Sequence, residues 1–163
     1  MRLLTAQIVG FLGIVALVVC FQPKRMKNVL KLKLLCDVTW GLHYFLLGAY
    51  SGFATNVVCC IREIIFMSDR KIFKSQLWLL VFVGFNIISA ILTWKTVFNI
   101  LPATASVLST FAFWKKKVLL TRCIALMNNI LMFTYDVAVA SYFGIFAESL
   151  TFISVIIALI RHR

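Results

Sequence analysis

Seven apolar runs of about membrane-spanning length fill most of this sequence, and only short polar segments separate them. A helix needs roughly 20 predominantly apolar residues to cross the hydrocarbon core of a bilayer. Hydrophobic residues make up 63% of the 163 residues and charged residues 13%, whereas about a quarter of a soluble domain is charged. The sequence therefore predicts an all-α integral membrane protein that forms a single membrane domain over residues 1–163.

The predicted spans end at basic segments or at uncharged turns. Six of them cover about residues 3–21, 34–49, 52–67, 77–94, 97–114 and 119–140, and the seventh ends at Ile160. With the N-terminus outside, the basic segments after spans one, three and five and the basic tail lie in the cytoplasm. The other loops carry only Lys95, as the positive-inside rule expects. We therefore predict seven transmembrane helices, with the N-terminus outside and the C-terminus cytoplasmic.

The sequence also repeats weakly. An offset of 92 residues keeps loop charges, turn glycines and intramembrane polar residues in register: Lys24 with Lys116, Asp37 with Asn129, Gly52 with Gly144, and Asn56 with Glu148. This predicts two three-helix bundles, residues 3–67 and 97–160, joined by a linker helix at residues 77–94. Because the linker is a single span, both bundles would enter the membrane in the same orientation.

Polar residues inside the predicted spans are the candidate functional residues. An ionisable group within hydrocarbon costs about 2.5 kcal/mol or more, so it needs a partner or a water-filled cavity. We expect a substrate site near the membrane midplane, lined by Asn56, Glu148, Asn129, Asp37 and Trp40. The candidates for moving a proton or a charge are Glu148, Asp37, His43 and Arg62.

Each candidate also has a structural interpretation. Glu148 could serve only as a partner of Asn56, Asn128 or a base. Asp37 would be favoured near a helix start by the helix dipole. His43 could be a hydrogen-bonded structural residue, and Asp136, nearer the outer surface, could simply be solvated.

The arginines within the predicted spans suggest where charge is neutralised. Adjacent residues do not face each other on a helix, so we expect no pair between Arg62 and Glu63. Arg62 and Arg122 are predicted to extend toward the inner membrane surface. Where Arg62 neutralises an acid, Asp37 is the expected partner.

Several function classes find no support in the sequence. No Ser-His-Asp set, H-E-x-x-H motif or phosphate loop is present, so we do not expect an enzyme. The five cysteines lack C-x-x-C spacing, and we expect neither a metal nor a cofactor. The net charge of +12 is spread over short segments, which argues against nucleic-acid binding.

A run from His43 to Tyr50, HYFLLGAY, resembles the bacterial inner-membrane YgjV family. Further matching residues lie at compatible spacing along essentially the full chain: Arg62, Leu101-Pro102, Ser109-Thr110, Arg122-Cys123 and Glu148. This resemblance implies residence in the bacterial cytoplasmic (inner) membrane. More widely, the 3+1+3 pattern resembles the SWEET sugar facilitators and the PQ-loop and MtN3-like group.

The wider resemblance implies roles for particular residues. Asn56 and Glu148 match positions that face a central substrate cavity, and Pro102 matches a hinge proline. Gly10 stands at the matching hinge position of the first bundle, and the acidic Glu148 departs from a purely passive sugar site.

These observations favour a transporter-like carrier of a small polar solute, sugar-like or similar, that works by rocking the two bundles. Its flux would couple to protons if Glu148 or Asp37 titrates during transport. The alternative is a non-transporting partner subunit or a receptor-like scaffold of the same fold. The expected partners are the lipid bilayer and the solute, and assembly into a homo-oligomer is left open.

Overall fold

The structure, a computed structural model, describes residues 2–68, 70 and 75–161, with side chains from Ile8 onward. Every regular element in these residues is helical, which confirms the predicted all-α class. The helices are α1 (Arg2–Cys20), α2 (Met26–Leu47), α3 (Tyr50–Met67), α4 (Gln76–Leu92), the short 3-10 helix η2 (Val97–Asn99), α5 (Ile100–Lys115), α6 (Val118–Ala138) and α7 (Tyr142–Arg161).

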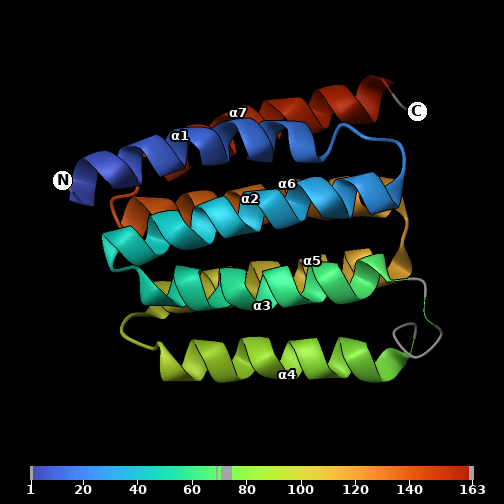
Figure 1. The fold of residues 1–163 in the computed structure, drawn as a ribbon, viewed down its shortest axis with the longest axis horizontal. Helices are drawn as coiled ribbons and strands as arrows, with labels where there is room; N and C mark the ends of the chain where they lie inside the picture. The colour runs from blue at the N-terminus through green and yellow to red at the C-terminus, as the bar shows by residue number, and fades with distance from the viewer. Residues whose placement is uncertain (1, 69, 71–74, 162–163) are drawn as a thin grey trace.

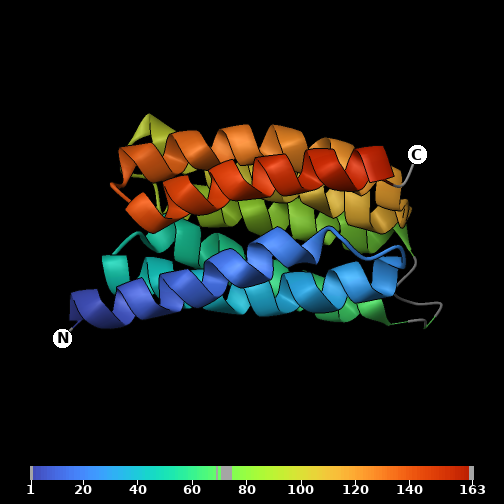
Figure 2. The ribbon, with the colours of Figure 1, turned by 90° about the horizontal axis from the view of Figure 1, so that it is seen from above.

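The helices form two layers with one further helix beside them (Figure 1). In the first layer α2 lies between α1 and α3, and in the second α6 lies between α7 and α5. Figure 2 shows α1 and α2 on one side of the molecule and α6 and α7 on the other. The layers meet where α1 packs against α7 and α3 packs against α5, while α4 contacts α3 and α5.

Successive helices run in opposite directions, so the first and last described residues lie at opposite ends of the bundle (Figure 1). We call the end where α2 joins α3 and α6 joins α7 the turn end. The opposite end, where α1 joins α2 and α5 joins α6, is the loop end. At the turn end, Gly48 has φ of 74° and Ala140 has φ of 55°. A residue in this left-handed conformation commonly terminates a helix, and glycine adopts it most easily.

The start of α2 differs from the sequence-based expectation. The sequence predicts a basic loop up to about residue 33, but the helix begins at Met26. Lys31 and Lys33 therefore lie on α2. Lysine is a good helix former, so a basic residue lowers the hydropathy of a segment without ending its helix.

Three described segments are long and apolar enough to cross a membrane: Val97–Lys115, Val118–Ala138 and Tyr142–Arg161. Ile8–Cys20 and α4 are apolar but shorter. α2 and α3 carry charged side chains that lower their hydropathy, and three of these, Asp37, Arg62 and Glu63, are at most 2% exposed. The charge in α2 and α3 is therefore directed partly into the bundle.

Apolar side chains cover the outside of the bundle, and polar side chains lie between its helices. Leu92 is 79% exposed and Ile160 is 72% exposed, whereas Thr110 and Thr151 are fully buried. Lipid tails can cover such an apolar surface, and buried polar groups must then find partners inside the protein. This arrangement concentrates the candidate functional residues in the interior.

Part of the predicted charge pattern cannot be compared with the structure. Asp69, Lys71 and Lys74 of the third basic segment, and His162 and Arg163 of the tail, lie outside the described residues.

Candidate functional site

A cavity of about 90 Å³ lies between the two layers, with a lining contributed by α1, α2, α3, α5, α6 and α7. Its lining includes all five predicted substrate-binding residues: Asp37, Trp40, Asn56, Asn129 and Glu148. Arg62 and Pro102 also line it. Residues that the sequence pattern selected from four separate helices thus meet in one place.

The cavity is small for a ligand site. Pockets for drug-sized molecules measure about 300–1,000 Å³, and one water molecule takes about 30 Å³ in the liquid. In this state the cavity has room for a few waters or for a solute of a few heavy atoms.

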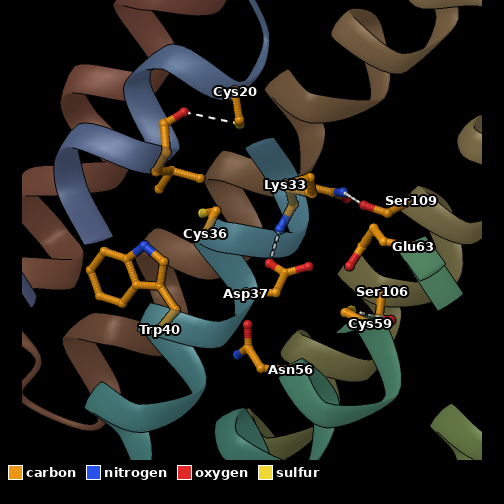
Figure 3. A network of polar contacts seen from close by, with 12 residues as sticks. Cys20, Lys33, Cys36, Asp37, Trp40, Asn56, Cys59, Glu63, Ser106 and Ser109 are labelled. Carbon is orange, nitrogen blue, oxygen red and sulfur yellow. Dashed lines mark hydrogen bonds and ion pairs between the residues drawn. The ribbon is translucent and has the colours of Figure 1, made fainter. Parts of the chain in front are cut away.

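One face of α2 supplies much of the cavity wall. Lys33, Asp37 and Trp40 share this face because residues three and four apart stack along a helix. Figure 3 shows Asp37 and Trp40 of α2 and Asn56 of α3 around the same space. Trp40 Nε1 donates to the backbone carbonyl of Gly13 in α1 at 3.2 Å, which fixes the indole ring.

Two ion pairs neutralise charge at the cavity. Lys33 Nζ pairs with Asp37 Oδ1 one helical turn further along α2. Arg62 Nη2 donates to Glu63 Oε1 at 2.6 Å, and both side chains are fully buried. Arg62 Nη1 also donates to the carbonyl of Ser106 and to Thr110 Oγ1, each at 2.9 Å, and so connects α3 to α5.

These contacts correct three sequence-based expectations. Arg62 does not extend to the membrane surface, because it is fully buried against α5. Its acid partner is the adjacent Glu63, not Asp37, which pairs with Lys33. The rule that neighbouring residues point apart holds near the backbone, but two long side chains can still meet at their tips.

Glu148 of α7 is held by α6. When the side-chain amide of Asn129 is oriented to suit its neighbours, its nitrogen donates to Glu148 Oε2 at 2.9 Å and to the carbonyl of Ala125 at 3.1 Å. Its oxygen then accepts from the backbone N–H of Phe152 at 3.1 Å. The partner of Glu148 is thus Asn129, whereas the sequence suggested Asn56, Asn128 or a base.

Side-chain hydrogen bonds join the two layers at the turn end. Tyr44 Oη donates to Asp136 Oδ1 at 2.7 Å, and Asp136 is fully buried. Of the two interpretations left open for Asp136, the structure thus excludes simple solvation. A second contact joins α3 to α6 at the same end. The hydroxyl of Ser51 lies 2.9 Å from that of Tyr135, which also accepts from the backbone N–H of Gly52 at 3.2 Å.

His43 belongs to this turn-end network and not to the cavity lining. Its Nε2 lies 3.2 Å from Ser141 Oγ, and its ring contacts those of Trp40 and Tyr44. Gly10 of α1 lies against the same imidazole, because a Cβ built at Gly10 would approach His43 Nδ1 to 3.0 Å. Glycine at position 10 thus allows α1 to approach His43 closely.

Arg122 makes the main inter-element contacts at the loop end. It is 3% exposed, and its Nε donates to the carbonyl of Phe21 at 3.1 Å. Its Nη2 donates to the carbonyls of Gln22 and Pro23 at 3.3 and 3.4 Å. The predicted extension of Arg122 toward the inner membrane surface stays a prediction; its guanidinium lies at the loop end and binds the chain that leaves α1.

Pro102, the predicted hinge residue, lies in the first turn of α5 and lines the cavity. A proline is tolerated in a first helical turn because its missing N–H would have no partner there.

Two charged residues at this site were not among the predicted site residues. Lys33 was assigned to a loop, although its spacing of four residues from Asp37 is a helical signal for an ion pair. Glu63 was placed on the polar face of its helix and noted as the neighbour of Arg62, but it was not selected as a site residue. Asn128, which the sequence suggested as a partner of Glu148, also lines the cavity. Its Nδ2 donates to Ser109 Oγ at 2.6 Å.

Within the described residues, no group of three or more His, Cys, Asp or Glu side chains is arranged to hold a metal ion. All five cysteines are free thiols.

An apolar exterior, helices of spanning length and a cavity between the two layers define a helical integral membrane protein. The sequence matches the Imp-YgjV family, described as bacterial inner membrane protein, over residues 4–163. The chain belongs to this family, as the run from His43 to Tyr50 predicted. The comparison with curated proteins found no match, and the comparison with solved structures found none. The wider resemblance to SWEET and PQ-loop proteins stays a prediction.

Proposed function

We propose that this inner-membrane protein carries a small polar solute across the membrane and that the solute binds in the central cavity. The observation that carries the proposal is the meeting of Asp37, Trp40 and Asn56 from one layer with Asn129 and Glu148 from the other around one cavity. Polar side chains in a membrane helix are costly, and they commonly mark a path for a solute or an ion.

We further propose that all seven α-helices span the membrane, with the N-terminus outside, and that the layers are two three-helix bundles linked by α4. The helix starts support the repeat: Met26 of α2 and Val118 of α6 are 92 residues apart, as are Tyr50 of α3 and Tyr142 of α7. Under this offset α1 corresponds to α5, and α3 corresponds to α7. The contacts support the repeat too, because α1 packs against α7 and α5 packs against α3.

The proposed cycle alternates access to the cavity from the two sides. The Tyr44–Asp136 hydrogen bond and its neighbours join the layers at the turn end, so this structure represents a state closed at that end. Rocking of the two layers would break these bonds and open the cavity to the outside. Such a motion of two repeats about a midplane site is the usual mechanism for carriers built from repeats.

The cavity lining suggests the solute class. The indole ring of Trp40 offers an apolar face, and the amides of Asn56 and Asn129 offer hydrogen bonds. Such a combination suits the half-apolar faces of sugars and similar molecules. At about 90 Å³ the closed cavity is too small for a whole sugar, so a sugar-like solute requires the open state to be larger.

A thermal-shift screen of the purified protein against sugars, nucleosides, vitamins and amino acids tests the proposal. A ligand that binds the folded state raises its apparent stability by mass action. The key variant is Asn56→Ala, and Asn86→Ala in α4 is its matched control. Both asparagines are buried and donate to the carbonyl four residues earlier, at 2.8 and 2.7 Å, but only Asn56 lines the cavity. A ligand shift should persist in Asn86→Ala and vanish in Asn56→Ala; a shift kept by both variants would contradict the proposed site.

A non-transporting partner subunit is the second candidate, and one observation favours it. Four charged groups at the cavity are already paired with each other, Lys33 with Asp37 and Arg62 with Glu63. Such pairing is what a purely structural polar core requires. A stoichiometric partner retained in mild detergent, together with no solute flux, would favour this role over the carrier.

A further inference from the structure

Two carboxyl groups from neighbouring helices face each other beside the cavity. Asp37 of α2 is 2% exposed, and Glu63 of α3 is fully buried. Figure 3 shows their carboxyl groups directed at one another, within reach of a hydrogen bond if one of them carries a proton.

Each carboxyl group has one oxygen with a partner and one without. Asp37 Oδ1 pairs with Lys33, and Glu63 Oε1 accepts from Arg62. Asp37 Oδ2 and Glu63 Oε2 are buried and have no hydrogen-bond partner. An unsatisfied buried polar atom is costly and rare, so a pair of them on facing groups needs an explanation.

One proton satisfies both orphaned oxygens. An ionised carboxylate can only accept hydrogen bonds, so two of them face to face repel and leave both oxygens without a donor. If one carboxyl group is protonated, its O–H donates to the other and the repulsion is removed. We propose that Asp37 and Glu63 bind a single shared proton and that this pair is a proton-binding site in the wall of the central cavity.

The surrounding charged and titratable groups are consistent with one proton. Lys33 and Arg62 each remain paired with one carboxyl oxygen, so the cluster carries a net charge of +1 with the proton and none without it. The other titratable groups nearby are the thiols of Cys20 (α1), Cys36 (α2), Cys59 and Cys60 (α3), the hydroxyl of Tyr44 (α2), and Glu148 from α7 on the same cavity. The groups that α5 presents to Arg62, Ser106 and Thr110, do not titrate.

A metal cation fits this position less well than a proton. Hard cations such as Ca²⁺ and Mg²⁺ take about six or more oxygen ligands. Among the described side chains that line the cavity, the fully buried oxygens without a hydrogen-bond partner are Asp37 Oδ2 and Asn128 Oδ1, fewer than such a cation takes. A metal cation would also lie beside the positive charges of Lys33 and Arg62.

The site follows from geometry alone, but its role in transport rests on the function proposed above. If the protein is a carrier, protonation of the Asp37–Glu63 pair changes the charge of the cavity wall during the cycle. The proton would then be the ion whose movement is coupled to that of the solute.

Difference infrared spectroscopy of the reconstituted protein tests the site. The wild type at neutral pH should show the C=O band of a protonated carboxylic acid, which shifts in heavy water and disappears as the pH is raised. The band should be absent in Glu63→Gln and in Asp37→Asn, because either variant leaves a lone carboxylate next to a neutral amide. Glu148→Gln is the matched control, since it removes another buried acid of the same cavity, and it should keep the band.

Three results would overturn the proposal: no such band in the wild type, no difference in this band between the wild type and Glu63→Gln or Asp37→Asn, or its loss in Glu148→Gln. A sodium-ion site is tested by comparing thermal stability in sodium chloride and in choline chloride. If sodium chloride stabilises the wild type and Glu63→Gln abolishes this effect, the site binds Na⁺ and the proposal is overturned. If Asp37→Asn fails to fold, the comparison of the wild type with Glu63→Gln still tests the site. The amide of glutamine can donate a hydrogen bond to Asp37 as the protonated acid does, so this variant should keep the fold. The predicted bands without any solute flux would contradict only the carrier, whereas flux without the bands would contradict only the proton site.

Discussion

Tyr44 and Asp136 are 92 residues apart, the offset of the proposed repeat, and they meet through a 2.7 Å hydrogen bond between the two layers. Contact between equivalent residues is expected where a two-fold axis relates two halves of a chain. The bond therefore lies near the axis about which we propose that the layers move.

Tyr44→Phe should destabilise the closed turn end. The variant keeps the ring but removes a hydrogen-bond donor from a fully buried carboxyl group, at an expected cost of about 1–3 kcal/mol. Thermal unfolding in detergent measures the loss. Tyr50→Phe is the control, because Tyr50 at the same end is 50% exposed. Equal stability of the two variants would contradict a closing role for Tyr44.

Gly144→Ala should disrupt the same contact by crowding. A Cβ at Gly144 would lie 2.3 Å from Asp136 Cγ, so the carboxyl group or α7 must move. Overpacking of this kind typically costs about 1–3 kcal/mol. Gly84→Ala in α4 meets nothing within 4 Å, and it should stabilise its helix by up to about 1 kcal/mol. Melting temperatures that move the same way in both variants would contradict this packing.

The sequence predicted much of this site but not how its charges pair. Asp37, Asn56, Asn129 and Glu148 were recognised as polar residues at helical spacing within apolar runs, and that signal is local. The partner of Arg62 depends on how α3 packs against α5 and on how two long side chains bend, which no spacing rule encodes.

The location of Lys33 was missed for a different reason. Positive charge was interpreted as a topology signal, so a lysine near a basic segment was assigned to the loop. The helix start at Met26 reverses that assignment, because it places Lys33 one turn before Asp37 on α2. For Arg122 the structure adds partners that a sequence does not reveal, because they are backbone carbonyls.

Arg62→Met should be among the most damaging single substitutions in the interior. Removal of one partner of a buried ion pair leaves an uncompensated charge and typically costs about 3–5 kcal/mol. The double variant Arg62→Met/Glu63→Gln removes both charges and should recover a substantial part of the lost stability. Denaturation of the single and double variants measures this coupling, and strictly additive losses would contradict the Arg62–Glu63 pair.

The proposed orientation can be tested with a membrane-impermeant thiol reagent on intact cells, in a variant without the native cysteines. A cysteine at position 142, where Tyr142 is 79% exposed at the turn end, should be labelled from outside. A cysteine in place of the exposed Lys117 at the loop end should be labelled only after the membrane is opened. The reverse pattern would invert the topology.

Solute counterflow in proteoliposomes tests the central claim most directly. Vesicles are loaded with an unlabelled ligand from the thermal-shift screen, and entry of the labelled ligand is followed for the wild type, Asn56→Ala and Asn86→Ala. We predict that the wild type and Asn86→Ala accumulate label and that Asn56→Ala does not. Absence of exchange for every ligand that binds, or exchange that Asn56→Ala leaves unchanged, would contradict transport through the central cavity.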